Sequence, residues 1–323
     1  MSKRGHAIFH DIHEFEESSA DIGLISDYLQ VDKGVPTIRH DCLYLRDMIL
    51  RRFQISHALI DGFRVRGGWT TFVFTSHLGQ EALWNGVHSL PNALGILRSG
   101  LDHEVLMPAG WSTLEIDVAN HLIDSEGLLP KPVFTGAMAP QKGQLRLTAP
   151  AAAAARRKLA ALLDHAGPQT HFVLTEDPAV GLRREILDLL AHATGLGCED
   201  AMCRPESSAF QKRRLVRKAR AMLEQQLHDS PRIDTIALEL GVTVRSLQRS
   251  FLTVLGVSPK QYLLARKLDA ARRAMRRRRH AGGVFDVAHE FGFVSPSRFA
   301  EQFRRHFGHT PSALTRLAAN LGS

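Results

Sequence analysis

The stretch that decides the fold is Val284–Pro311, VFDVAHEFGFVSPSRFAEQFRRHFGHTP, because a second version of it occurs at Ile233–Pro259, IDTIALELGVTVRSLQRSFLTVLGVSP. Each version has an alanine, a glycine four residues later, a hydroxyl residue, two apolar residues spaced by four, and a Gly-x-Ser/Thr-Pro end. The offset is 51 residues up to the turn glycine and 52 after it, so the second turn holds one extra residue. Repetition at matched positions predicts the same supersecondary unit twice.

The chemistry of the repeat predicts a helix-turn-helix in each copy. The alanine lets two helices approach closely, and the glycine permits a tight turn with φ > 0. The hydroxyl residue caps the next helix, whose two apolar residues pack onto a core. Two unrelated helical hairpins are the alternative, which the matched turn residues disfavour. The residues in these roles are Ala237, Gly241, Thr243, Leu247 and Phe251 in the first copy and Ala288, Gly292, Ser295, Phe299 and Phe303 in the second.

Residues 213–316 resemble the DNA-binding domain of AraC/XylS-type transcriptional regulators. The resemblance rests on Arg266-Lys267-Leu268-x2-Ala271-Arg272 and on Val284-x2-Val287-Ala288-x3-Gly292-Phe293-x5-Phe299-x3-Phe303-x3-Phe307-Gly308-x2-Pro311. It covers about a third of the chain. It implies an all-α domain at 213–318 that binds double-stranded DNA through two helix-turn-helix units, joined by a helix over about 259–278.

The resemblance also implies which side chains of the first unit face DNA. Arg245, Gln248 and Arg249 stand at positions that reach base edges in the family. Arginine suits the O6/N7 pair of guanine, and glutamine suits the N6/N7 pair of adenine. Ser246 and Arg249 are equally suited to holding phosphates.

The second unit is expected to present Pro296, Ser297, Arg298 and Glu301. Glu301 departs from the family, in which a basic residue is common at this position. A carboxylate there would oppose phosphates or accept a hydrogen bond from cytosine N4. The run Arg276–Arg279 lies between the two units and is suited to phosphate contact, or else is a solvated turn.

The charge of the chain is divided unevenly. Residues 204–323 hold 23 Lys and Arg against 9 Asp and Glu, whereas residues 1–203 hold 18 against 24. A basic segment behind an acidic one fits a nucleic-acid module joined to a domain of another kind. We therefore expect an N-terminal sensor and dimerisation domain at 1–194, a turn-rich linker at 195–212 and the DNA-binding domain after it.

The N-terminal part is expected to be sheet-rich, which makes the chain α+β. Short strand patterns broken by Gly and Pro over 56–119 indicate a β-barrel or jelly roll, and 40–53 suggests a strand leading into a short helix. The hairpin sequence Leu106–Val118 resembles an element of cupin-like sensor domains. Two amphipathic helices follow, at Ala151–His165 and Val180–His192. They are expected either to form the seam of a homodimer or to pack on their own barrel.

The N-terminal domain offers two arginine clusters that suit an anionic small-molecule effector, because arginine binds carboxylate and phosphate in bidentate fashion. A solvated face is the alternative for both. The lining of a pocket is expected among aromatic side chains, for which ordinary barrel core is the alternative. The candidates are Arg46, Arg51 and Arg52 in one cluster, Arg64 and Arg66 in the other, and the aromatics Phe63, Trp69, Phe72, Phe74 and Trp84.

No catalytic, metal or cofactor motif is apparent in the sequence. It holds no His-x-His in the barrel region, no P-loop and no Gly-x-Ser-x-Gly elbow, and Cys198 and Cys203 lack a second ligand pair. The N-terminus shows no signal peptide and no apolar run of membrane-spanning length, so we expect a cytoplasmic protein.

The sequence therefore favours a DNA-binding transcriptional regulator that responds to a small molecule. The family resemblance adds contact with RNA polymerase as an expected partnership. An enzyme carrying a DNA-binding domain, and a regulator controlled only by a protein partner, are the alternatives.

Overall fold

A computed structural model describes most of the chain and divides it into two compact units. The first comprises Met1–Tyr28, Pro36–Ser56 and Asp61–Glu206, and the second Leu29–Val35, His57–Ile60 and Ser207–Ser323. The predicted domain boundaries stay predictions, because residues 196–206 of the expected linker, with Cys198 and Cys203, lie outside the described residues. The described residues are 3–20, 25–75, 82–84, 87–89, 92–128, 144–165, 176–195, 207–229, 231–277 and 283–314.

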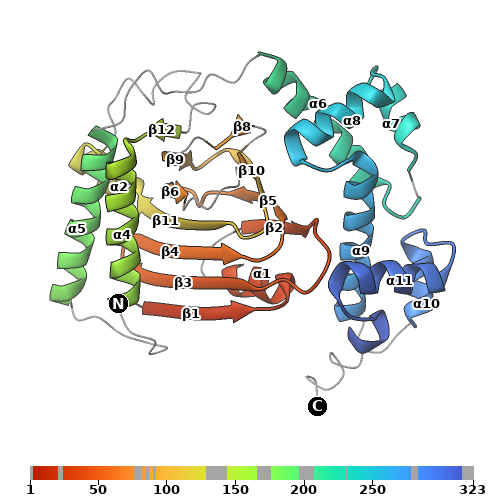
Figure 1. Ribbon diagram of the computed structural model, residues 1–323, viewed down its shortest axis with the longest axis horizontal. Helices are drawn as coiled ribbons and strands as arrows, with labels where there is room; N and C mark the ends of the chain where they lie inside the picture. Colours follow the sequence, from red (N-terminus) through yellow and green to blue (C-terminus); the bar gives the residue numbers. More distant parts are fainter. Residues whose placement is uncertain are drawn as a thin grey trace. The chain divides into compact units, whose positions relative to one another are not determined.

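The sheet-rich unit is built on a seven-stranded antiparallel sheet and a five-stranded sheet (Figure 1). The larger sheet has the order β1 (Lys3–Phe9), β3 (Ile38–Leu45), β4 (Met48–Ile55), β11 (Ser112–Ala119), β6 (Trp69–Thr75), β9 (Ala93–Arg98) and β12 (Gln144–Arg146). The smaller has the order β2 (Ile25–Gln30), β5 (Leu59–Arg64), β10 (Asp102–Met107), β7 (Leu83–Trp84) and β8 (Val87–His88). Two short helices, α1 (Ile12–Ala20) and α2 (Asn120–Glu126), complete the strand region.

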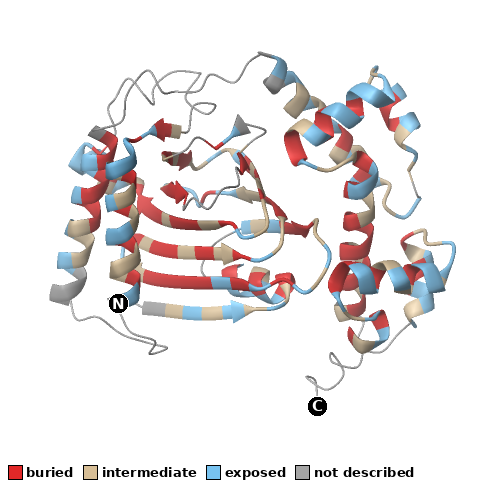
Figure 2. Cartoon of the chain, in the orientation of Figure 1, coloured by how far each residue is buried: buried red, intermediate tan, exposed pale blue. Residues whose placement is uncertain are grey.

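One face of the seven-stranded sheet is covered by helices α4 (Ala149–His165) and α5 (Glu176–Gly195). Side chains alternate along a strand, so every second residue of the central strands points to these helices. Figure 2 shows the central strands largely buried. The apolar stripes of α4 and α5 thus pack on their own domain, as one of the two alternatives expected. The cluster includes Leu50, Phe72, Phe74, Ile116 and Val118 from the strands and Leu159, Leu163, Ile186 and Leu190 from the helices.

The helix expected near residue 50 does not form. Residues 38–55 make the β3–β4 hairpin instead, with Leu45 paired to Met48. The turn between them holds Arg46 at φ 21°, a backbone angle rare for a residue other than glycine. Residues of β4 alternate between two faces. Met48 and Leu50 pack in the core under the helices, whereas Ile49 and Arg51 line a pocket on the other face.

The second unit contains the two predicted helix-turn-helix units. They are α7 (Ile233–Glu239) with α8 (Val244–Leu255), and α10 (Val284–Glu290) with α11 (Pro296–Phe307). Helix α6 (Ser207–Gln225) precedes them, and α9 (Pro259–Arg277) joins them. The α+β class, with a sheet-rich N-terminal part and a helical C-terminal part, is therefore confirmed.

The turn chemistry is as the repeat predicts. Gly241 and Gly292 have φ values of 68° and 70°, the left-handed region that glycine enters without strain. Thr243 and Ser295 cap their helices, because each side-chain oxygen accepts a hydrogen bond from the backbone N–H three residues on. Among the helices of the described ranges, none combines the length and the apolar character needed to cross a membrane.

Candidate nucleic-acid interface and ligand pocket

Helix α8 has one buried face and one exposed, basic face. Leu247 and Phe251 are fully buried, as are Val254 and Leu255 at the next turn. The side chains predicted to face DNA, Arg245, Ser246, Gln248 and Arg249, are all exposed. The first helix-turn-helix therefore exposes two guanidinium groups, an amide and a hydroxyl on one side of a capped helix, where a partner can bind them.

Helix α11 repeats this arrangement with different chemistry. Phe299 and Phe303 are fully buried, while Ser297, Arg298 and Glu301 are exposed and Pro296 at the first helical position is half-buried. Proline at this position is pre-organised for a helix start and lacks only an N–H that would be unpaired there. This exposed face carries a carboxylate beside a guanidinium, so it is less basic than that of α8.

A buried tyrosine ties helix α6 to the long helix α9. The hydroxyl of Tyr262 on α9 accepts hydrogen bonds from Arg220 Nε on α6 at 2.7 Å and from Arg266 Nε at 2.9 Å, and it donates to Glu224. Burial raises the pKa of Tyr262 to about 12, so the phenol keeps its proton. Arg266, which belongs to the family-like stretch, is buried and serves this network.

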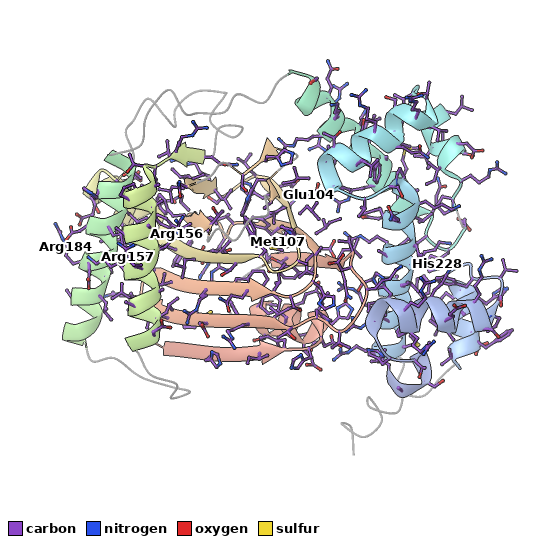
Figure 3. The ribbon with its side chains drawn as sticks, viewed as in Figure 1. Glu104, Met107, Arg156, Arg157, Arg184 and His228 are labelled. Carbon is purple, nitrogen blue, oxygen red and sulfur yellow. The ribbon has the colours of Figure 1, made fainter. Side chains whose placement is uncertain are left out.

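Buried and stacked side chains also hold the second helix-turn-helix in place. Arg272 and Phe307 belong to the family-like stretches, whereas the sequence analysis did not single out His228. The guanidinium of Arg272, only 2% exposed, lies 4.5 Å from the ring centre of Phe307. His228, labelled in Figure 3, hydrogen-bonds through Nδ1 to the backbone oxygen of Glu290 at 2.9 Å and stacks on Phe291. These contacts hold the helices of the unit in fixed positions. His228 had no distinctive signal in the sequence, because a lone polar residue in a turn is normally solvated.

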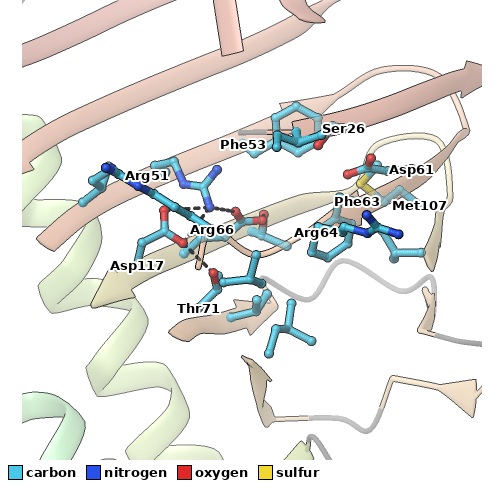
Figure 4. Close-up of a pocket in the computed structure, with 18 of the residues that line it drawn as sticks. Ser26, Arg51, Phe53, Asp61, Phe63, Arg64, Arg66, Thr71, Met107 and Asp117 are labelled. Atoms are coloured by element: carbon cyan, nitrogen blue, oxygen red, sulfur yellow. Dashed lines mark hydrogen bonds and ion pairs between the residues drawn. The ribbon is translucent and has the colours of Figure 1, made fainter. Parts of the chain in front are cut away.

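The sheet-rich unit contains a pocket between its two sheets (Figure 4). The empty space of the pocket, with its opening to solvent counted, is about 850 Å³. Its wall is largely aromatic, with strands β4, β6 and β11 on one side and β2, β5 and β10 on the other. The aromatic lining comprises Phe15, Tyr28, His40, Phe53, Phe63, Trp69, Trp84 and Trp111.

A buried arginine and two carboxylates form a network on the large-sheet side. Arg51 Nη2 lies 3.0 Å from Glu115 Oε2 and 2.9 Å from Asp117 Oδ2, and Thr71 donates to Asp117 Oδ1 at 2.5 Å. Opposing charges raise the pKa of Arg51 against the effect of its burial, so the guanidinium stays charged. Burial, with Arg51 nearby, lowers the pKa of His40 to about 3, which leaves that ring neutral.

Asp61 on β5 is a separate polar group of the same pocket. It is 7% exposed, and its Oδ1 has no hydrogen-bond partner among the described residues. Burial raises its pKa well above 3.8, and the charges of Glu115, Asp27 and Glu16 raise it further, against a hydrogen bond with Ser26. Figure 4 shows Asp61 beside Phe63 and Met107, away from the Arg51 network.

The predicted arginine clusters are not gathered into one site. Arg51 lines the pocket, whereas Arg52 points to the other face of β4, where it pairs with Asp41 and Asp164 at 2.7 Å each. Arg46 is exposed in the β3–β4 turn. Adjacent residues of a strand point to opposite faces, so a run such as Arg51-Arg52 cannot converge on one ligand.

The other predicted lining residues are also divided between pocket and core. Arg64, Arg66, Phe63, Trp69 and Trp84 line the pocket. Arg64 pairs with Asp102 at 2.5 Å, and Arg66 lies 5.3 Å from the ring centre of Trp69. Phe72 and Phe74 face helices α4 and α5 instead, so the barrel-core alternative is correct for them.

The pocket carboxyls Asp61, Glu115 and Asp117 were missed from the sequence. Their signal was an acidic residue at alternate positions of an otherwise apolar strand, as in STLEIDVA at 112–119. Such residues can face either solvent or the interior of the domain. Which of the two occurs depends on what packs against that face of the sheet.

Two capped helix-turn-helix units that expose basic side chains define this protein as a DNA-binding protein. The family model "Helix-turn-helix domain" matches residues 236–316. The regulatory protein SoxS of Escherichia coli K12 is 34% identical over 92 residues, which are 28% of this chain and 84% of SoxS. The chain belongs to the AraC/XylS family of transcriptional regulators.

Two other similar proteins each match about a third of the chain. The probable thc operon regulatory protein of Rhodococcus erythropolis is 34% identical over 99 residues, 30% of either chain. The match thus spans about a third of the length of that relative. The solved structure of an AraC-type regulator from Chromobacterium violaceum has a TM-score of 0.32 and 26% identity, and it covers 35% of this chain and 97% of that one.

Proposed function

We propose that this protein is a transcriptional regulator that reads DNA through α8 and α11 and responds to a small molecule held between the sheets of its N-terminal unit. The observation that carries the proposal is the presence, in one chain, of two capped helix-turn-helix units and a separate aromatic pocket with buried polar groups. Such a pocket is the usual form of a small-molecule site.

The roles of the individual helices follow from their exposed faces. Helix α8, with Arg245, Gln248 and Arg249, is proposed to read base edges, and Ser246 to hold phosphate. Helix α11, with Pro296, Ser297, Arg298 and Glu301, is proposed to position the domain and to read fewer bases, because its carboxylate opposes phosphates.

A homodimer, contact with RNA polymerase and a role without catalysis complete the proposal, as the family resemblance implies. An enzyme is disfavoured because the polar groups of the pocket hold one another in ion pairs rather than forming a nucleophile and base. A regulator controlled only by a protein partner would not need a pocket, so the aromatic pocket favours a small molecule.

The test is selection of binding sites from random DNA with the full chain, followed by affinity measurements on the selected site and on a scrambled one. The proposal requires a defined site, preferred by at least about a thousandfold over scrambled DNA at physiological salt. Equal affinity for both sequences would contradict it.

A further inference from the structure

Acidic groups outnumber basic groups in the inner part of the pocket. This inner part holds three carboxyl groups, the buried Asp61 and Asp117 and the partly buried Glu115, and one buried guanidinium, Arg51. The other two cations of the wall, Arg64 and Arg66, are exposed. Water and salt screen exposed charges far more than buried ones, so the inner part of the pocket is acidic.

Arg51 is already engaged. It lies within 3.0 Å of both Glu115 and Asp117, and Thr113 donates to Glu115 at 2.9 Å while Thr71 donates to Asp117. Arg51 Nε has no hydrogen-bond partner among the described residues, but an anion there would be opposed by two carboxylates within 3.0 Å of the same guanidinium. In this unit of Arg51, Glu115 and Asp117 a single cation holds two anions, so the unit carries an excess of negative charge.

Asp61 lies in the same pocket without such a unit. The charges that act on it come from the carboxylates Glu115, Asp27 and Glu16. Its Oδ1 is without a hydrogen-bond partner in the part of the chain that the structure describes, although the side chain is 93% buried. A buried polar atom left unpaired is unfavourable unless something else fills the position. A positively charged donor from outside the chain would satisfy both the hydrogen bond and the excess of negative charge.

The rest of the wall also suits a cation. Phe53 stacks on Phe15 at 5.3 Å and lies 6.2 Å from Tyr28, and Phe63 and Trp69 lie on the same lining. The faces of aromatic rings carry partial negative charge and attract ammonium groups, most strongly where water is excluded. The same rings bury the apolar part of an organic ligand.

We propose that the pocket binds a small organic cation, an amine with an apolar or aromatic body, whose ammonium group pairs with Asp61 while its body packs on the aromatic wall. This inference rests on the proposed function of the pocket as an effector site and names the class of effector. It replaces the anionic ligand expected from the arginine clusters, because the buried arginine is paired and the exposed ones lie where water competes.

The test uses the full chain and three matched probes by isothermal titration calorimetry: tryptamine, tryptophol and indole-3-acetate. They share an indole ring and differ in bearing a positive, neutral or negative end. We expect tryptamine to bind about tenfold or more tightly than tryptophol, since a charge-assisted hydrogen bond contributes at least that factor. Indole-3-acetate should bind most weakly. Tightest binding by indole-3-acetate, equal binding by all three, or no binding of tryptamine at millimolar concentration would each overturn the proposal.

A variant assigns the preference to Asp61. Asp61→Asn should reduce the tryptamine preference about tenfold and leave tryptophol binding nearly unchanged. Asp124→Asn, on the exposed surface of α2, is the matched control and should behave as wild type. An unchanged preference in Asp61→Asn would overturn the assignment. The comparison of probes on the unmodified chain decides the charge class even if this variant does not fold.

The same samples separate this inference from the proposed function. DNA affinity is measured by fluorescence anisotropy with and without tryptamine. Tight tryptamine binding that leaves DNA affinity unchanged supports the chemistry of the pocket and contradicts its role as an effector site. Absence of specific DNA binding in every sample contradicts the proposed function alone, while the calorimetric ranking still decides the ligand class.

Discussion

Arg272 of α9 lies with its guanidinium 4.5 Å from the ring centre of Phe307 at the end of α11, and both side chains are buried. A desolvated cation on an aromatic face is among the stronger side-chain contacts. It fixes the second helix-turn-helix to the helix that also carries the first. The spacing of the two candidate recognition helices therefore depends on a residue that does not itself reach the surface.

Arg272→Ala should destabilise the helical unit by roughly 2–4 kcal/mol, because a large buried side chain and its ring contact are both removed. The measurement is urea unfolding followed by circular dichroism. The control is Arg305→Ala, which removes an exposed arginine from the last turn of α11. It should change stability by less than about 0.5 kcal/mol. Similar losses in both variants would show that the Arg272 contact does not stabilise the unit.

Substitutions on α8 should affect specificity. Gln248→Ala or Arg245→Ala should cost roughly 1–3 kcal/mol on the selected site and little on scrambled DNA, because base-edge contacts exist only on the correct sequence. Equal losses on both DNAs would mean that these side chains hold phosphates.

Arginines between the two units should affect general affinity instead. The run Arg276–Arg279 falls at the end of α9, and Arg278 and Arg279 lie outside the described residues. Replacing Arg278 and Arg279 by Ala should weaken binding to all sequences and shallow the salt dependence by about one unit per lost phosphate contact. A salt series on selected and scrambled DNA measures this, and a loss confined to the selected site would refute the assignment.

Glu301→Gln tests whether α11 reads bases. If its carboxylate mainly opposes phosphates, removal of the charge should strengthen binding on selected and scrambled DNA alike, by a few tenths to about 1 kcal/mol. The opposite result, weaker binding at sites with one particular cytosine, would show base readout through N4.

Asp61 should make the stability of the sheet-rich unit depend on pH. Its pKa is raised on folding above 3.8, so its contribution to stability is present below that value and is lost as the pH rises through the folded pKa. Asp61→Asn should therefore raise the unfolding free energy at neutral pH by roughly 1–3 kcal/mol, and the gain should shrink towards pH ~4.

All three tryptophans lie in the sheet-rich unit, so their fluorescence follows the unfolding of that unit. They are Trp69, Trp84 and Trp111. The measurement is thermal unfolding of wild type and variant over a pH series. A gain that is the same at every pH would show that folding does not raise the pKa of Asp61.

The helical half of the fold was predictable because its signals are local. Turn glycines, caps and apolar pairs such as Phe299 and Phe303 act within a dozen residues, and the repeat displayed them twice. The strand positions of residues 58–119 were also largely predictable from alternation and from turn residues.

The pocket was not predictable to the same degree, because it depends on which face of each strand is covered. Arg51 and Arg52 are neighbours in sequence, yet one lines the pocket and the other faces α4. Phe72 and Phe74 seemed suited to a ligand and are core, since helices α4 and α5 cover their side of the sheet. Which face of a strand is covered depends on its pairing with strands that are distant in sequence. A local sequence pattern does not contain this information.

The most direct test of the proposed DNA recognition is a chemical footprint of the full chain on its selected site. Helix α9 has 19 residues, which at 1.5 Å per residue span about 28 Å, near the roughly 34 Å between successive major grooves. Each protomer is therefore predicted to protect two major-groove segments about 10 bp apart on one side of the DNA, with unlike sequences in the two segments. Protection of a single major-groove segment per protomer, or of two segments of identical sequence, would contradict the account.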